Sequence, residues 1–74
     1  MTFDYSKLKG KIREICGTQE KFAEALGRTD TTINNKLNNK SLFTQDEILN
    51  SVEVLGISPN EIAEYFFNQK VEKN

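Results

Sequence analysis

The sequence predicts an all-α fold: a compact bundle of about five helices that contains a helix-turn-helix, in a single domain spanning residues 1–74. Three observations support this prediction. Apolar residues recur at spacings of three and four along the chain, Asp, Ser or Thr precedes each apolar segment, and Gly closes most of the segments. The core must be thin, because a domain of this size buries only about 60% of the surface of its unfolded chain.

The first helix is expected to begin at Asp4, whose carboxylate can cap it, and to end at Gly17. Phe3 is placed to pack on Leu8 as a hydrophobic staple. The predicted inward stripe is Tyr5, Leu8, Ile12, Ile15 and Cys16. Gly10 costs about 1 kcal/mol relative to Ala inside a helix, which predicts the close approach of another segment there.

The second and third helices form the predicted helix-turn-helix, at about residues 18–38. Thr18 caps the second helix, Gly27 ends it, and Thr29 caps the third. The inward-facing residues of the pair are Phe22, Ala23, Leu26, Ile33 and Leu37. In this motif the second helix of the pair enters the major groove of DNA, so the opposite face of that helix must stay free.

Two capping boxes organise the second half of the chain. The first runs from Thr44 to Glu47, with Phe43 and Ile48 placed as a staple, and it opens a helix that Gly56 closes. The predicted buried stripe of this helix is Ile48, Leu49, Val52 and Leu55.

The second capping box, residues 58–61, has Pro59 at the first helical position. The last helix is expected over residues 62–68. Its aromatic run is Tyr65, Phe66 and Phe67. Residues 68–71 are compatible with either a continuation of this helix or a short strand, and the tail at 72–74 is expected to fray.

The composition argues against catalysis and metal binding. The chain has no His and one Cys, which removes the usual zinc sites and histidine-based catalysis. We therefore expect no enzyme, no catalytic residues, no cofactor, no metal and no small-molecule substrate. Cys16 is expected to pack as a small core residue, and a lone Cys fits a reducing cytoplasm. No apolar run is long enough for a membrane span, so we expect a cytoplasmic protein in a bacterial host cell with no membrane partner.

Charge is distributed unevenly along the chain. Residues 1–40 carry eight Lys or Arg against five Asp or Glu, a net +3, whereas residues 41–74 carry two against six, a net −4. The total of −1 is unusual for a DNA-binding protein, but a basic first half can supply the contact surface. Chance clustering on a solvated surface is the alternative explanation.

The free face of the third helix is small and polar. Its residues are Asp30, Thr31, Asn34, Asn35 and Asn38. Hydroxyl and amide side chains can read base edges, and Asn can bond adenine through two hydrogen bonds. Asn is a mediocre helix former, so three of them on one face favour a functional role over an ordinary solvated helix.

These residues resemble a known family. Thr18-Gln19 followed by Ala23, Gly27 and Ile33 is similar to the helix-turn-helix of the Cro/phage-repressor (XRE-type) family. Four further runs resemble small Cro-like proteins of temperate phages of Gram-positive bacteria: Cys16-Gly17-Thr18-Gln19, Lys36-Leu37-Asn38, Asp46-Glu47-Ile48-Leu49 and Tyr65-Phe66-Phe67-Asn68.

The resemblance implies roles for individual residues. Base contacts are expected from Asp30, Thr31, Asn34 and Asn35. DNA backbone contacts are expected from Thr18, Gln19, Arg28, Thr29, Lys36, Asn38 and Lys40, with Lys36 toward the edge. Two residues depart from the family pattern: Asp30 places a negative charge where a neutral residue is frequent, and Arg28 replaces an apolar turn residue. The turn is therefore more exposed, or Arg28 reaches a phosphate.

Two hypotheses about function follow. In the first, the chain is a sequence-specific regulator that binds double-stranded operator DNA in a lysis/lysogeny-type switch, as a homodimer because one helix covers one half-site. In the second, it is a protein-interaction modulator that binds the phage repressor and alters the repressor's DNA binding. The acidic second half, Asp30 and the aromatic run at 65–67 favour the second hypothesis, although core packing also explains the aromatic residues.

Overall fold

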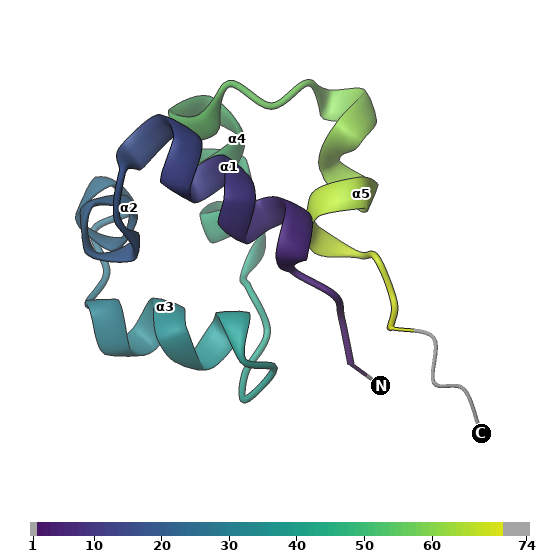
Figure 1. Cartoon of the computed structure of the whole chain (residues 1–74), viewed down its shortest axis with the longest axis horizontal. Helices are drawn as coiled ribbons and strands as arrows, with labels where there is room; N and C mark the ends of the chain where they lie inside the picture. The colour runs from purple at the N-terminus through teal and green to yellow at the C-terminus, as the bar shows by residue number, and fades with distance from the viewer. Residues whose placement is uncertain (1, 71–74) are drawn as a thin grey trace.

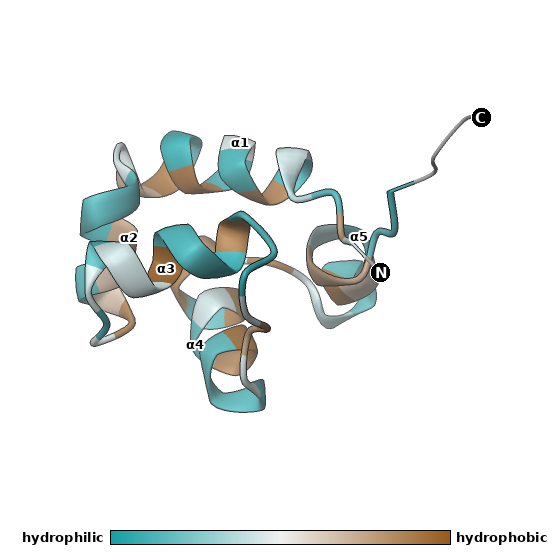
Figure 2. Cartoon of the chain, turned by 90° about the horizontal axis from the view of Figure 1, so that it is seen from below, coloured by the Kyte–Doolittle hydropathy of each residue, from teal (hydrophilic) through white to brown (hydrophobic). Residues whose placement is uncertain are grey.

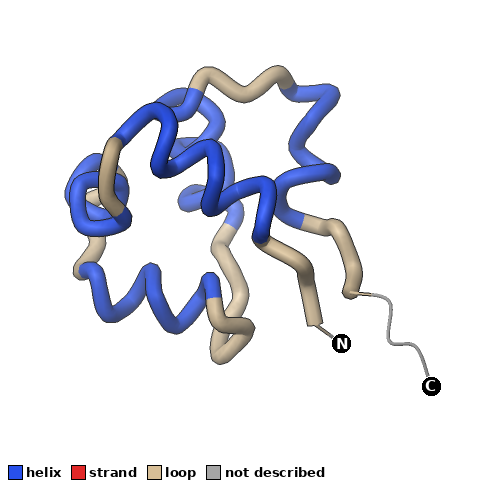
Figure 3. The backbone as a smooth tube through the Cα atoms, in the orientation of Figure 1, coloured by secondary structure: helices blue, strands red, loops and turns tan. Residues whose placement is uncertain are grey.

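The computed structural model describes residues 2–70, and this part of the chain folds into five α-helices and one 3-10 turn (Figure 1). The elements are α1 (Ser6–Cys16), α2 (Gln19–Ala25), α3 (Asp30–Leu37), α4 (Gln45–Leu55), η1 (Pro59–Glu61) and α5 (Ile62–Phe66). Figure 3 shows these helices joined by loops, with no strand in the described part. The predicted all-α fold class is confirmed. The tail expected to fray, residues 72–74, lies outside the described residues.

The core forms where α1 packs against α2, α4 and α5. In Figure 2 the apolar sides of the helices turn toward one another, and the polar sides face outward. The buried apolar residues are Tyr5, Leu8, Ile12, Phe22, Ala23, Leu26, Ile33, Leu37, Leu55, Ile57, Tyr65 and Phe66. Burial of a large apolar side chain contributes about 1.5–3 kcal/mol, so this cluster supplies the main stabilisation of the fold.

The predicted caps of the middle helices are present. The Thr18 hydroxyl accepts a hydrogen bond from the Lys21 N–H at 3.1 Å, and the Thr29 hydroxyl accepts one from the Thr32 N–H at 3.2 Å. Gly27 adopts φ 70°, the left-handed conformation that the turn before Thr29 requires. Both predicted capping boxes also form, and the second one opens the 3-10 turn rather than an α-helix.

The start of α1 differs from the prediction. Tyr5, not Asp4, occupies the cap position. Asp4 still satisfies the first turn, because its Oδ1 accepts hydrogen bonds from the Ser6 N–H at 2.9 Å and from the Ser6 hydroxyl at 2.6 Å. The expected close approach at Gly10 is wrong: a Cβ there would meet no atom within 4 Å.

Two residues expected to face inward are exposed: Ile15 by 47% and Leu49 by 60%. Phe67, for which core packing was one of two explanations, is exposed by 52%. In α4 the reason is a rotated face, since the buried row is Glu47, Ser51 and Leu55, at spacings of four. This row places Ile48 and Val52 at the flank and Leu49 in solvent. Cys16 is half-buried, and burial raises the pKa of its thiol, as expected for a packed cysteine.

The two ends of the described chain lie side by side (Figure 1). α5 ends at Phe66, two residues before the expected end, and the following residues turn back along the N-terminal segment. A single antiparallel bridge joins Phe3 and Gln69, so residues 68–70 form neither a longer helix nor a full strand. None of the described helices has the length and apolar character needed to cross a membrane.

Candidate functional site

The α2–turn–α3 unit is held to the core by its apolar side. Phe22 and Ile33 are fully buried, and Ala23 is 1% exposed, so all three face inward as predicted. The turn is closed by a hydrogen bond from the Arg28 N–H to the Ala23 carbonyl at 2.9 Å. This packing leaves the other side of α3 at the surface.

The residues predicted for the free face of α3 differ in their exposure to solvent. Asp30, Thr31, Asn34 and Asn38 are exposed. Asn35 is half-buried, because the chain after α3 folds back and the Lys40 N–H donates to the Asn35 carbonyl at 2.8 Å. Within the described residues, the side chains of Thr31 and Asn38 make no hydrogen bond, so they are available to a partner.

Gln19 connects α2 to this surface. Its side-chain amide donates to Asp30 Oδ1 at 3.0 Å and to Asn34 Oδ1 at 3.4 Å. The two helices of the unit are thus tied together at the surface as well as in the core. The contact engages three of the predicted DNA-contact residues with one another and leaves the Asp30 carboxylate exposed.

Glu47 forms a buried ion cluster beneath the unit. It is 1% exposed, and its carboxylate accepts hydrogen bonds from Arg28 Nε at 2.9 Å, from Lys36 Nζ, and from the Thr44 N–H at 2.7 Å. Burial alone raises the pKa of Glu47. The hydrogen bond from Lys36, reinforced by those from Thr44 and Arg28, outweighs burial and lowers the pKa to about 2.

This cluster involves two basic residues that were predicted to contact the DNA backbone. Lys36 was expected at the edge of the exposed face, but it is 8% exposed and its ammonium group points to Glu47, a position incompatible with a phosphate contact. The turn around Arg28 is exposed, as one of the two alternatives predicted, and Arg28 Nε pairs with Glu47. A phosphate contact of Arg28 stays a prediction. The sequence identified Glu47 as a capping residue but gave no sign of its ion pairs, because these join residues 11 and 19 positions apart.

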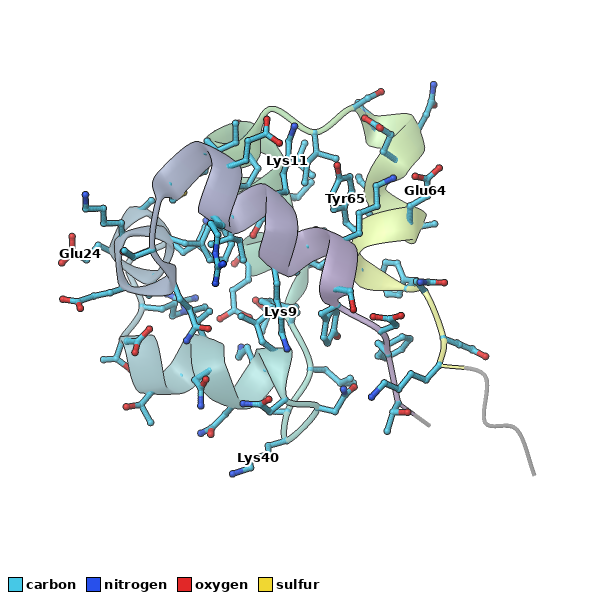
Figure 4. All side chains as sticks on the ribbon, viewed as in Figure 1. Lys9, Lys11, Glu24, Lys40, Glu64 and Tyr65 are labelled. Atoms are coloured by element: carbon cyan, nitrogen blue, oxygen red, sulfur yellow. The ribbon has the colours of Figure 1, made fainter. Side chains whose placement is uncertain are left out.

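Five basic residues have no ion pair within the described chain: Lys9, Arg13, Lys21, Lys40 and Lys70. Two of them, Lys9 and Arg13, belong to α1. Lys9 extends from α1 toward the end of α3, whereas Lys40 points away from the bundle (Figure 4). Lys9 and Arg13 border a cleft of about 340 Å³. Its other lining residues are Ile12, Gly17, Thr18, Gln19 and Leu37. The predicted backbone-contact residues Thr18 and Gln19 therefore lie beside Lys9 and Arg13. These two cations were not among the predicted DNA-contact residues.

A second surface is apolar and lies at the other end of the molecule. We call it the aromatic groove: a depression of about 240 Å³ lined by Phe3, Tyr5, Leu42, Phe43, Gln45, Ile48, Phe66 and Phe67. Leu42 is 70% exposed and Phe67 is 52% exposed at its rim. The rings meet edge to face, with centroids 5.5 Å apart for Tyr5 and Phe43 and 5.3 Å apart for Phe43 and Phe66.

Tyr65, the first residue of the aromatic run, belongs elsewhere. It is buried against α1, where the Lys7 ammonium lies 4.8 Å from the centre of its ring and also pairs with Glu64 (Figure 4). The run at 65–67 thus divides: Tyr65 joins α1 to α5, Phe66 forms the floor of the groove, and Phe67 is left at its rim. No three His, Cys, Asp or Glu side chains in residues 2–70 are arranged to hold a metal ion.

Comparison with known proteins identifies relatives of this fold. Residues 1–69 match the family described as "Protein of unknown function (DUF739)". Among curated proteins no relative matches the chain. The solved structure of the modulator of repression (MOR) of the temperate bacteriophage TP901-1 from Lactococcus lactis is 51% identical, with a TM-score of 0.79, over 97% of each chain. The expected resemblance to small regulators of temperate phages is supported, while the wider Cro/phage-repressor assignment stays a prediction. The chain belongs to the DUF739 family.

Proposed function

We propose that this chain is a modulator of repression: it binds the repressor protein of its own phage, in the cytoplasm of the bacterial host, and alters the repressor's binding to operator DNA. The observation that carries the proposal is the 51% identity, over 97% of each chain, to a protein described as a phage modulator of repression. Identity of this extent preserves the fold, so a shared partner class is the simplest inference.

The aromatic groove is the surface that we assign to the repressor. Large apolar residues at a rim are costly in water, at about 25 cal/mol per Å² of apolar surface, and a partner that covers them recovers this free energy. Leu42 and Phe67 are the most exposed of them. Aromatic residues are also enriched at the energetically dominant centres of protein interfaces.

The charge of the α3 surface also supports a protein partner over DNA. Its exposed side carries the Asp30 carboxylate, and the one cation of α3, Lys36, is neutralised by Glu47. Affinity for DNA depends on cations that neutralise phosphates, so this helix offers little of it. A protein partner has no such requirement.

Titration calorimetry with the purified repressor of the same phage tests the proposal. We expect binding of the wild-type chain, and at least a fivefold loss of affinity for Phe67→Ser, since an interface anchor contributes more than about 1 kcal/mol. Ile15→Ser is the matched control, because Ile15 is similarly exposed, at 47%, but does not line the groove. Absence of heat with the wild-type chain, or equal losses for both variants, would contradict the proposal.

A second candidate function is direct binding of the chain to operator DNA, as a homodimer. The cations Lys9, Arg13 and Lys40, which lack ion pairs in the described chain, and the free side chains of Thr31 and Asn38 favour it. Gel shifts with operator DNA, with and without repressor, separate the two functions. Direct binding predicts a shift by this chain alone that weakens as salt rises; modulation predicts a change only when the repressor is present.

A further inference from the structure

The N-terminal segment, residues 2–4, is clamped on both edges. On one edge it pairs with residues 68–70: the Asp4 N–H donates to the Asn68 carbonyl at 2.6 Å, and the Lys70 N–H donates to the Thr2 carbonyl at 3.1 Å. On the other edge lies the loop between α3 and α4. An end segment normally frays unless such contacts hold it. The loop contact therefore helps to keep Phe3, which lies in this segment, in a fixed position.

The loop contact is made by the side chain of Asn39. Its Oδ1 accepts a hydrogen bond from the Phe3 N–H at 2.8 Å, and its Nδ2 donates to the Phe3 carbonyl at 3.0 Å. One amide therefore satisfies both backbone groups of a residue 36 positions away. This pairing reproduces the hydrogen bonding of a neighbouring strand, and it fixes the position and direction of the Phe3 backbone.

Asn39 also has an unusual backbone conformation. With φ 64°, it is the sole non-glycine residue with positive φ in the described chain. Asn tolerates this left-handed conformation better than most residues, but Gly adopts it without strain. The loop conformation is therefore compatible with Asn or Gly, whereas the two hydrogen bonds to Phe3 require Asn.

Phe3 transmits this constraint to the aromatic groove. Its ring lies 6.0 Å from Tyr5 and 6.1 Å from Phe67, centre to centre. Among the ring contacts of the described residues, Phe3 is the one aromatic neighbour of Phe67. The wall formed by Phe3 thus sets where the exposed Phe67 ring rests, and Asn39 sets where Phe3 lies.

We propose that Asn39 is a positioning residue for the repressor: it does not contact the partner, but it holds Phe3 as a preformed wall of the aromatic groove. The inference rests on the proposed function and adds to it a residue outside the groove. A preformed wall improves affinity because the partner does not have to order the chain end during binding.

The test is repressor affinity of Asn39→Gly, measured by titration calorimetry. Gly keeps the loop conformation and removes both hydrogen bonds, which are internal to the chain, so the melting temperature should fall. At a temperature where both chains are folded, affinity should fall about threefold to tenfold, the range expected for one or two neutral hydrogen bonds. Asn39→Asp retains the acceptor for the Phe3 N–H but sets a carboxylate oxygen against the Phe3 carbonyl, so it should lose at least as much affinity as Asn39→Gly. Asn38→Gly is the matched control, since Asn38 is the exposed neighbour of Asn39 and its side chain makes no hydrogen bond within the described residues.

A double-mutant cycle with Phe3→Ala separates positioning from general stability. If Asn39 acts through the Phe3 ring, Asn39→Gly should have no further effect on affinity in the Phe3→Ala chain. Equal losses in both backgrounds, or an Asn39→Gly affinity within twofold of wild type, would overturn the role of Asn39 and leave the proposed function intact. A wild-type chain that does not bind the repressor would overturn both.

Discussion

The junction of α3 with α4 and the aromatic groove differ in which groups they bury and which they leave in water. At the junction, charges are buried and paired: Glu47 satisfies Arg28 and Lys36, and the surface above it is polar and close to neutral. At the groove, apolar rings remain partly in water, with Phe67 52% exposed. The molecule therefore uses its internal ion pairs for its own stability and leaves its exposed apolar surface at the groove.

The largest effect should come from removing the shared anion of the junction. Glu47→Ala leaves two cations without their partner, one of them buried, and loss of one member of a buried pair costs about 3–5 kcal/mol. Urea unfolding measures this loss. Glu53→Ala is the control, because Glu53 lies exposed on the same helix without an ion pair among the described residues. Losses that match within about 0.5 kcal/mol would show that the cluster contributes no stability.

The same cluster predicts acid sensitivity. The folded pKa of Glu47, about 2, lies below its ordinary value of 4.5, so its contribution is complete above pH 4.5 and is lost as the pH falls toward 2. The gap corresponds to about 3 kcal/mol, at about 1.4 kcal/mol per pH unit. Urea unfolding at a series of pH values should show this decline in the wild-type chain and a flatter one in Glu47→Gln. Parallel curves would assign the acid sensitivity to other groups.

A substitution outside both regions provides a reference for stability alone. Gly10→Ala should raise the free energy of unfolding by about 1 kcal/mol, because the position is helical and a Cβ there meets no neighbouring atom. Thermal unfolding measures the gain. Repressor affinity should not change, and a change would mean that global stability, rather than the groove, limits binding.

Local chemistry explains which parts of the fold could be predicted. Thr18, Thr29 and Thr44 cap helices through N–H groups three residues away, so the sequence alone identifies them. The inward face of α4 could not be predicted from periodicity, because the buried row includes the charged Glu47, which is stable there only through partners on other elements. Hydrophobic patterning assigns such a residue to the surface.

The same distinction applies to the functional surfaces: local spacing predicts one of them, whereas the other forms only in the tertiary fold. The exposed positions of Asp30, Thr31, Asn34 and Asn38 follow from the helical spacing of Ile33 and Leu37. The aromatic groove does not follow from any spacing, since residues near 3, 42 and 67 meet there through the tertiary fold. Leu42 lies in a loop without periodicity, and nothing in the neighbouring sequence marks it as part of a surface.

Asp30→Asn is the smallest change, and it compares the two regions as docking surfaces. The substitution keeps the shape of the side chain and removes its charge from the first turn of α3, where a carboxylate interacts favourably with the helix dipole by about 0.3–1 kcal/mol. The melting temperature should therefore fall slightly. Repressor affinity, measured by calorimetry, should stay within twofold of wild type, because Asp30 does not line the groove.

The other possible outcomes of Asp30→Asn each identify a different use of the α3 surface. Weaker repressor binding with a reduced salt dependence would mean that the carboxylate pairs with basic residues of the repressor, and the docking surface would then extend to α3. A gain in affinity for all DNA sequences would mean that Asp30 repels phosphates and that this surface lies against DNA. Because Gln19 loses a charged acceptor at 3.0 Å in either case, Gln19→Ala should be measured beside it. If Gln19→Ala reproduces the effect, the geometry of the two helices is responsible, and the charge of Asp30 is not.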